Sequence, residues 1–334
     1  MDTALLLEWT IKSALIIVAL LTGFAYLTLL ERRILARIQV RIGPNRAGPF
    51  GLLQPVADGI KLLFKEELIP ATADKLLFVL APIITLVPAL IILAVVPIGP
   101  EVTLFGRTIF LGLADGVNVG GLYLMAVSSI SVYGIVIAGW SSNNKYALMG
   151  GLRSSAQMIS YELALGLAFV GPILLAGSMS LRDIVVDQKD LWYVVWQPVG
   201  FLVFLIAAIA EVNRAPFDMP EAEQELTAGY HVEYSGMKFA LIFMAEYDKM
   251  IAVSVIAAAL FLGGYWGPGV DQIPWLGPVY LFLKVLAVLL LMIWLRATLP
   301  RFRYDRLMAF GWKILLPLAL LNVAVTAVVV VLGG

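Results

Sequence analysis

The chain has 334 residues, of which 61 % are hydrophobic and only 14 % are charged. About a quarter of the residues of a typical soluble protein are charged, so this composition excludes a soluble fold of the same size. Lys plus Arg and Asp plus Glu number 23 each. The net charge is therefore zero and does not indicate nucleic acid as a partner. With no cysteine and one histidine, the chain cannot hold disulfides, thiolate-bound iron–sulfur clusters or a bis-histidine haem, and a multi-histidine zinc site is disfavoured.

Eight stretches of about 20 mainly apolar residues predict membrane-spanning helices, because a spanning segment in lipid must satisfy its own backbone hydrogen bonds. They cover roughly 11–30, 76–96, 119–139, 156–176, 192–212, 237–262, 279–299 and 311–332. The fifth and sixth are the weakest, since Glu211, Glu246, Asp248 and Lys249 interrupt them. The sequence therefore predicts an all-α polytopic membrane protein, with residues 1–334 forming a single integral membrane domain.

The basic residues indicate how these helices are oriented. An even number of spans puts both termini on one side of the membrane. Seventeen of the 23 Lys and Arg lie in or beside the first, third, fifth and seventh connections. Because Lys and Arg are enriched in cytoplasmic loops, we expect the odd-numbered connections in the cytoplasm and both termini on the outer, periplasmic side.

The first cytoplasmic connection, residues 31–75, combines a basic start with a rigid turn and an amphipathic helix. Five arginines between positions 32 and 46 are typical of a cytoplasmic anchor. Gly, Pro and Asn over residues 43–49 predict a turn. Apolar residues then recur at helical spacing over 52–65, which predicts a helix of about three turns lying in the membrane interface.

The connection between the fifth and sixth spans, residues 211–236, is the most acidic part of the chain, with six carboxylates in 23 residues. Asp218 and Glu221 fit a capping box, which would give part of this acidity a structural role at a helix start. Asp218, Glu221 and Glu225 would nevertheless share one helix face, where like charges repel. We therefore expect the cluster as a whole to be functional.

Two further carboxylates lie within predicted spans. Glu162 is a few residues into the fourth span, and Glu246 is near the middle of the sixth. An ionisable group in the bilayer costs about 2.5–3.5 kcal/mol on the insertion scale and marks a proton or ion pathway by default. The alternative is an internal ion pair, for which Lys249 is the nearest partner of Glu246. We expect both carboxylates to be functional.

Several segments together resemble one family. They are ERRIL (31–35), RIGPN (41–45), GPFGLLQP (48–55), KE (65–66), AQMISYE (156–162), EVNRAPFD (211–218) with Glu221, Glu223 and Glu225, EY (233–234), MAEY (244–247) and PRFRYD (300–305). This set is similar to the family of the membrane H subunit of respiratory complex I, whose mitochondrial counterpart is NADH dehydrogenase subunit 1. The resemblance runs from about residue 31 to residue 317 and shows no departure at the motif positions.

The resemblance implies a quinone-binding and coupling subunit that joins a peripheral redox arm to a proton-pumping membrane arm. A line of buried carboxylates would carry protons or the coupling signal toward the pumping subunits, and four other residues would line or flank the quinone path. By matching motif, the carboxylates are Glu162, Glu211, Asp218, Glu221, Glu223, Glu225 and Glu246, and the quinone-path residues are Arg32, Arg214, Phe217 and Phe243. The family's quinone entrance is framed by the first span, the sixth span and the amphipathic helix.

The resemblance also implies partners and cofactors. Flavin and iron–sulfur clusters would lie in partner subunits, which agrees with the absence of cysteine here, and quinone would be the substrate. No metal site is expected in this chain. We expect peripheral quinone-site subunits on the cytoplasmic side, other membrane-arm subunits alongside, no nucleic acid, and a multi-pass location in a bacterial plasma membrane.

Three other functions remain open at this point. A related membrane subunit of an energy-converting hydrogenase or formate hydrogenlyase would keep the fold without quinone. A stand-alone cation or proton transporter would act without partners. A purely structural anchor for a soluble redox arm would leave Glu162 and Glu246 unexplained.

Overall fold

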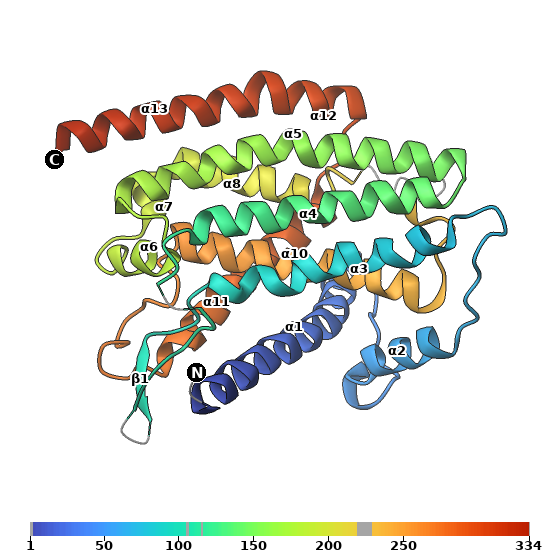
Figure 1. The fold of residues 1–334 in the computed structure, drawn as a ribbon, viewed down its shortest axis with the longest axis horizontal. Coiled ribbons are helices and arrows are strands. Elements are labelled where there is room, and N and C mark those ends of the chain that lie inside the picture. Colours follow the sequence, from blue (N-terminus) through green and yellow to red (C-terminus); the bar gives the residue numbers. More distant parts are fainter. Residues whose placement is uncertain (1–2, 105–106, 115, 219–228, 334) are drawn as a thin grey trace.

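A computed structural model describes residues 3–104, 107–114, 116–218 and 229–333. Long helices lie side by side through most of it (Figure 1). The strands of the described residues are β1 (Glu101–Leu104) and β2 (Arg107–Phe110), which pair antiparallel with Glu101 opposite Phe110. This small hairpin was not predicted. The prediction of a predominantly helical fold is confirmed.

Six helices of the described residues are long and apolar enough to cross a membrane. They are α1 (Thr3–Ile38), α3 (Lys75–Ile91) continued by the 3-10 turn η2 (Ile92–Val95), α4 (Gly120–Ser141), α5 (Lys145–Ala176), α11 (Leu276–Thr298), and α12 (Tyr304–Phe310) continued by the π-helical turn η4 (Gly311–Leu315) and α13 (Leu316–Gly333). They coincide with the six stronger predicted stretches.

The two weaker stretches also form helices, but each falls short as a span on length or composition. The fifth is divided between α7 (Tyr193–Trp196) and α8 (Pro198–Glu211), and α8 has only 14 residues. The sixth is α10 (Gly236–Phe261), which has 26 residues but carries Glu246, Asp248 and Lys249 in its middle. Length and apolarity alone therefore support six spans, and the predicted count of eight depends on α8 and α10.

The centre of the bundle is built from small side chains. Ala207, Ala208 and Ala210 on α8 are fully buried, as are Ala257–Ala259 on α10. Small residues let helix backbones approach closely in a membrane, where no hydrophobic force drives the helices together. The close packing of α8 and α10 places their polar residues deep in the protein.

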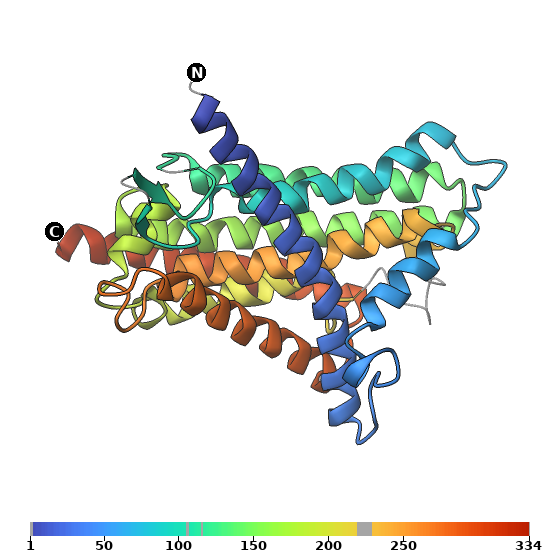
Figure 2. The ribbon, with the colours of Figure 1, turned by 90° about the horizontal axis from the view of Figure 1, so that it is seen from below.

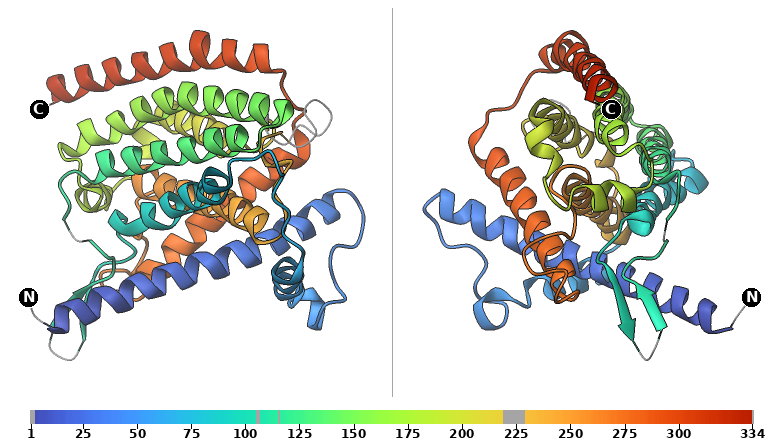
Figure 3. Two further views of the ribbon diagram at one scale, coloured as in Figure 1. Left: turned by 45° about the vertical axis from the view of Figure 1, so that its right-hand side comes forward. Right: turned by 90° about the vertical axis from the view of Figure 1, so that its left-hand side faces the viewer.

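The outer helices enclose this centre unequally. Helix α13 runs along α5 on one side, while α1 crosses the opposite side at a steep angle (Figures 2 and 3). Both chain ends point to the same end of the bundle, where the hairpin, α6 (Leu181–Asp187) and α7 also lie. The opposite end holds α2 (Gln54–Phe64) and the described residues that follow α8.

Helix α2 confirms the predicted helix at residues 52–65, although it begins two residues later. Its apolar side chains Val56, Ile60, Leu63 and Phe64 are all more than half exposed. A helix with such a stripe outside the bundle needs an apolar surrounding. Arg32 on α1 holds α2 in place through an ion pair with Asp58, whose nitrogen–oxygen distance is 2.6 Å.

Candidate functional site

Four charged residues from four different segments meet where α1, α10 and α11 come together. Glu31 of α1 is almost fully buried and accepts hydrogen bonds from Arg296 of α11 and from Arg214, which follows α8. Arg214 also pairs with Glu246 of α10, at 2.8 Å between Nε and Oε1. Its guanidinium lies 4.2 Å from the ring centre of Tyr247, within range of a cation–π contact. We call Glu31, Arg214, Glu246 and Arg296 the ionic junction.

The ionic junction changes the interpretation of Glu246. Lys249 was the nearest candidate for an ion pair with Glu246 in the sequence, but the partner in the structure is Arg214, 32 positions away. The predicted quinone-path residue Arg214 and the predicted relay residue Glu246 are therefore in direct contact. Burying two opposite charges is tolerable only when they are paired and hydrogen-bonded.

The segment after α8 is fixed by one buried glutamine. The side-chain amide of Gln157 on α5 donates to the carbonyl oxygens of Ala210 and Phe217, at 2.8 Å and 2.7 Å. The ring of Phe217 then packs between Tyr161 and Phe302, with ring centres 5.9 Å and 5.8 Å away. Buried carbonyls need such partners, so Gln157 determines where the predicted quinone-path residue Phe217 lies.

A series of aromatic rings leads to the ionic junction along α10. Phe239 stacks on Phe243, Phe243 contacts Tyr247, and Phe24 of α1 packs edge-on against both Phe243 and Tyr247. The ring centres are 4.8–6.2 Å apart, which is the usual range for aromatic pairs. The predicted residue Phe243 therefore lies in this row of rings between α1 and α10, with the ionic junction at one end. We call Phe24, Phe239, Phe243 and Tyr247 the aromatic seam.

Three cavities follow one another through the centre of the bundle from α10 to α5. The first is lined by Glu246, Lys249 and Glu211 among others, the second by Lys249 and Glu211, and the third by Glu211 and Glu162. Each offers about 20 Å³ to a water-sized sphere, and about 10–15 Å³ is enough for one water. The three predicted membrane carboxylates thus lie along one line of water-sized cavities, which we call the carboxylate line.

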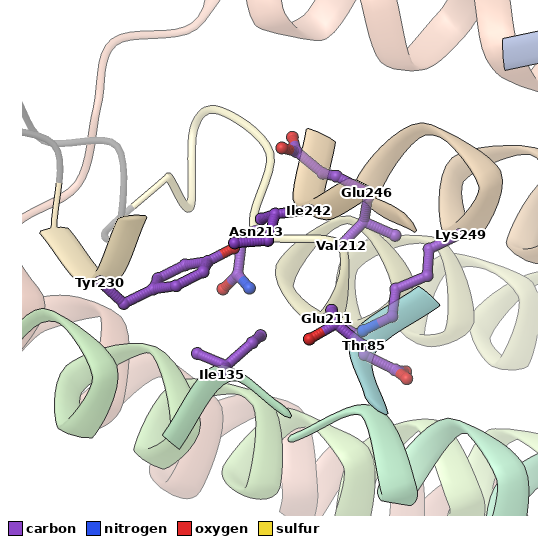
Figure 4. A pocket seen from close by; sticks show the side chains of 9 residues that line it. All are labelled: Thr85, Ile135, Glu211, Val212, Asn213, Tyr230, Ile242, Glu246 and Lys249. Carbon is purple, nitrogen blue, oxygen red and sulfur yellow. The ribbon is translucent and has the colours of Figure 1, made fainter. Parts of the chain in front are cut away.

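Figure 4 shows how the side chains of the first cavity lie. The ammonium group of Lys249 points toward Glu211 and Thr85, whereas the carboxylate of Glu246 points away from both. Glu246 therefore contributes its stem to the cavity and its carboxylate to the ionic junction. This single residue connects the two parts of the site.

The far end of the carboxylate line lies deeper than the sequence indicated. Helix α5 begins at Lys145, with Asn144 as its cap, so Glu162 lies near the middle of a 32-residue helix. Its carboxylate accepts a hydrogen bond from Ser129 of α4. Glu211, the last residue of α8, is 5 % exposed, and its Oε2 accepts no hydrogen bond from the described residues.

Two residues of this region were missed as site residues from the sequence. Lys249 lines two of the three cavities, and its charge interacts with Glu162, Glu211 and Glu246 together. Asp248 is completely buried, and neither carboxylate oxygen has a hydrogen-bond partner among the described residues. An ionisable residue within a predicted span is itself a functional signal, and both residues carried that signal.

The predicted acidic cluster is only partly visible. Asp218 accepts a hydrogen bond from Arg301 at 2.8 Å, which ties the connection after α8 to the segment before α12. Glu221, Glu223 and Glu225 lie outside the described residues, as does the helix that the predicted capping box would begin. Of the seven predicted carboxylates, the structure therefore places Glu162, Glu211, Asp218 and Glu246.

The end of the acidic connection is anchored beside α3. Glu233 accepts a hydrogen bond from Asn144 at 2.7 Å, and Tyr234 stacks on Phe78 with ring centres 4.1 Å apart. Burial raises the pKa of the Tyr234 phenol to about 12, so the side chain stays neutral. Its hydroxyl donates to the carbonyl oxygen of Phe78. These contacts fix the position at which α10 begins.

Comparison with known proteins agrees with the motifs. A family model described as NADH dehydrogenase matches residues 11–327. The chain belongs to this family. The H subunit of NADH-quinone oxidoreductase from Thermomicrobium roseum is 53 % identical over 334 residues, covering 94 % of this chain and 96 % of the relative. The H subunit from Protochlamydia amoebophila is 54 % identical, covering 92 % of this chain and 92 % of the relative. Subunit 8 from Thermus thermophilus is 53 % identical, covering 96 % of this chain and 87 % of the relative.

Membership of the NADH dehydrogenase family confirms the resemblance drawn from the motifs. The relatives are subunits of a multi-subunit oxidoreductase whose name includes its quinone substrate. Within the described residues, no group of three or more His, Asp or Glu side chains is arranged to hold a metal ion. The described site offers carboxylates, two arginines, a lysine and aromatic rings.

Proposed function

We propose that this chain is the quinone-site and coupling subunit of a proton-translocating NADH:quinone oxidoreductase. The observation that carries the proposal is the carboxylate line, which joins Glu246, Glu211 and Glu162 through three water-sized cavities. The full-length similarity to subunits of NADH-quinone oxidoreductase supports the reaction. The chain would act as a subunit of the enzyme that itself carries no redox cofactor, with flavin and iron–sulfur clusters in its partners.

The proposed arrangement in the membrane has eight spans in a single integral domain. Helices α8 and α10 lie among the six long apolar helices, which supports counting them as the fifth and sixth spans. Both chain ends point to one end of the bundle, as an even number of spans requires. Since most Lys and Arg lie toward the other end, that end faces the cytoplasm of a bacterium and the termini face outward.

We propose that quinone enters between α1, α2 and α10 and moves along the aromatic seam. Phe24, Phe243 and Tyr247 offer an apolar surface to the ring and tail, and Arg32 lies where α1 meets α2. Arg214 lies beyond these rings, against Tyr247. Phe217 lies further along the chain from Arg214, with its backbone held by Gln157. A reduced quinone needs two protons, and the ionic junction lies beside this path.

Glu246 is the proposed connection between quinone chemistry and the carboxylate line. Its carboxylate pairs with Arg214 in the ionic junction, while its stem lines the first cavity. Rotation about its side-chain bonds would move the carboxylate from one to the other. A change of charge at the ionic junction during quinone reduction would bias that rotation and transfer a proton toward Glu211.

Lys249 has a defined part in this proposal. Its ammonium points toward Glu211, and its charge interacts with all three carboxylates of the carboxylate line. A cation there favours the charged form of whichever carboxylate has lost its proton. Movement of a proton along the carboxylate line would then exchange the partner of Lys249 rather than leave an isolated buried charge.

The acidic connection of residues 211–236 and the basic connection of residues 31–75 are the proposed docking region for the peripheral quinone-site subunits. The described residues of both connections lie at the proposed cytoplasmic end, whereas the outer end carries the hairpin and the short helices α6 and α7. Other membrane-arm subunits would pack along the sides of the bundle. Crosslinks from the peripheral subunits that fall on the outer end would contradict this arrangement.

Purification of the complex through a tag on this chain tests the proposed function. The complex should contain flavin and reduce quinone with NADH, and its vesicles should accumulate protons during turnover. A flavin-free complex that evolves or oxidises hydrogen would instead indicate the hydrogenase alternative. Proton transport by the chain alone, without partners, would indicate a stand-alone transporter.

A further inference from the structure

A large apolar cavity lies away from the carboxylate line, in a crevice between α1 and α11. It has a volume of about 530 Å³, with α10 as its floor. Leu20, Gly23 and Leu27 of α1 face Leu281 and Val285 of α11 across it. Figure 2 shows the two helices converging at one end and diverging toward the other. We call this space the α1–α11 crevice.

The α1–α11 crevice follows α1 over a length comparable to the thickness of the bilayer core. Its lining on α1 runs from Ile16 to Arg33, a rise of about 26 Å at 1.5 Å per residue. The hydrocarbon core of a bilayer is about 30 Å thick. Phe282, which lines the crevice on α11, is 63 % exposed, so the crevice opens on the side of the bundle where lipid would lie.

The lining of the α1–α11 crevice carries one charge. It consists of apolar side chains and Tyr26 except at its convergent end, where Arg33 lies. Arg33 is half-buried, and it forms no hydrogen bond or ion pair with any described residue. The neighbouring Arg32 differs, since it is occupied by Asp58. A half-buried guanidinium beside an apolar space is matched by an anion that carries an apolar chain.

We propose that the α1–α11 crevice binds an anionic phospholipid of the cytoplasmic leaflet. The guanidinium of Arg33 binds the phosphate, and an acyl chain lies between Leu27 and Val285 toward Leu20. The leaflet assignment rests on the proposed orientation of the chain. Phospholipid fits better than quinone because the polar group present is a cation suited to phosphate. The proposed quinone path lies on the other flank of α1, at Phe24, which does not line the crevice.

A photolabelling experiment on the assembled complex tests this site. The complex is reconstituted with phosphatidylglycerol that carries a photoactivatable group on its acyl chain, and in parallel with the same label on phosphatidylcholine. Labelled peptides are mapped by mass spectrometry. We expect phosphatidylglycerol to label α1 between Ile16 and Arg33 and α11 between Leu281 and Leu289 roughly fivefold more than phosphatidylcholine does, because one Arg near the surface favours an anionic lipid by about that factor.

Two variants and one control sharpen the result. Arg33→Gln should reduce labelling by phosphatidylglycerol to the level of phosphatidylcholine, and Val285→Trp should reduce labelling by both lipids by filling the crevice. Arg306→Gln removes an equal charge from an exposed residue on α12 and should change neither. Equal labelling by both lipids together with no effect of Arg33→Gln would overturn the proposal.

Quinone is the competing occupant of the crevice, and a separate labelling experiment tests it. A photoactivatable quinone analogue should label α10 near Phe243 and leave the α11 peptides unlabelled. If it labels the α11 peptides and excess phosphatidylglycerol does not displace it, the crevice is a quinone site and the lipid proposal is wrong. Labelling by lipid should be unchanged in a Glu162→Gln complex, so failure of the relay and failure of the lipid site give different results.

Discussion

The ionic junction and the carboxylate line contain the same kinds of charged group but satisfy them differently. In the ionic junction, Glu31 is held by two arginines, and Arg214 binds two carboxylates and an aromatic ring. In the carboxylate line, Glu162 has one hydroxyl partner, and Glu211 has an oxygen with no partner among the described residues. The line instead has water-sized cavities beside its carboxylates.

This difference separates two uses of buried charge. A network of paired opposite charges is costly to disturb and fixes the relative positions of the helices that supply it, even though Glu31 Oε2 accepts no hydrogen bond from the described residues. A carboxylate with spare capacity and room for water can gain or lose a proton without breaking the fold. We therefore expect variants in the ionic junction to affect assembly first, and variants in the carboxylate line to affect turnover first.

Removal of Arg214 should have the largest effect. Arg214→Met leaves Glu246 without this partner and Glu31 with one arginine fewer, and breaking a buried pair costs about 3–5 kcal/mol. We expect little assembled complex on native gels and a large fall in its unfolding temperature. Arg214→Lys should recover part of both, since it restores the charge but not the two-sided geometry of the guanidinium.

The control for Arg214 is Arg303→Met, which breaks an exposed pair with Asp305. Surface pairs contribute at most about 1 kcal/mol, so this variant should assemble normally. Normal assembly of Arg214→Met would remove the structural role assigned to the ionic junction.

Replacement of Lys249 tests the cation of the carboxylate line. Lys249→Met keeps most of the side-chain length but removes the charge that the three carboxylates share. We expect the complex to assemble and the rate of NADH:quinone reduction to fall by roughly tenfold, about 1.4 kcal/mol of barrier. Lys249→Arg should retain more activity than Lys249→Met. An assembled Lys249→Met complex with an unchanged rate would show that the cation has no part in turnover.

Replacement of Gln157 should have a smaller effect. It tests whether quinone binding depends on the position of Phe217 or on the stability of the complex. Gln157→Leu leaves the carbonyl oxygens of Ala210 and Phe217 without their donor, at a cost of about 1–3 kcal/mol. We expect a lower unfolding temperature and a raised apparent KM for quinone, because Phe217 is no longer fixed. NADH:ferricyanide activity, which bypasses quinone, should be unchanged.

Gln188 provides the matched control for Gln157. It is equally buried and donates to the carbonyl oxygens of Ile184 and Ala259, near the outer end of the bundle. Gln188→Leu should lower the unfolding temperature without changing the KM for quinone. An equal rise of KM in both variants would mean that general destabilisation, and not the position of Phe217, determines quinone binding.

The smallest expected effect is at the aromatic seam. Phe243→Trp adds bulk between Phe24 and Tyr247, whose rings are already in contact with it. We expect the apparent KM for quinone to rise by roughly two- to threefold, which corresponds to about 0.4–0.7 kcal/mol, because the larger ring narrows the space beside Phe24 and Tyr247. Loss of NADH:ferricyanide activity in the same preparation would indicate misassembly instead.

Much of the fold was predictable because continuous apolar stretches in a membrane protein have few alternatives to helix. Helices α3, α4 and α11 lie within a few residues of their predictions. Helix α5 begins 11 residues earlier than predicted, because Asn144 caps it and the mixed residues that follow remain helical. The hairpin at 101–110 was missed, since two four-residue strands give too short a pattern to recognise.

The candidate site was predictable residue by residue but not as an arrangement. Family motifs identified Glu162, Glu211, Arg214 and Glu246, yet nothing in their spacing indicated that Arg214 pairs with Glu246. Glu31 was quoted in a motif and Arg296 was counted only as a basic loop residue, and their contact joins positions 265 apart. Such contacts depend on how α1, α10 and α11 pack, which hydropathy does not encode.

The most direct test of the carboxylate line is proton pumping by a Glu162→Gln complex. Glu162 is a better choice than Glu246, because Glu246→Gln would also break the pair with Arg214. Glutamine keeps the size of glutamate and can still accept from Ser129, but it cannot carry a proton. Glu101→Gln on the exposed hairpin is the matched control, and Glu162→Asp should preserve part of the activity.

The measurements are the rate of NADH-driven quinone reduction and the rate of proton uptake in sealed vesicles, and their ratio, with NADH:ferricyanide activity as the check on assembly. The account predicts that Glu162→Gln leaves ferricyanide reduction intact and lowers both quinone reduction and proton uptake by at least roughly tenfold, the scale of losing one proton-transfer group. An assembled Glu162→Gln complex that pumps protons at the normal rate and ratio would contradict the relay.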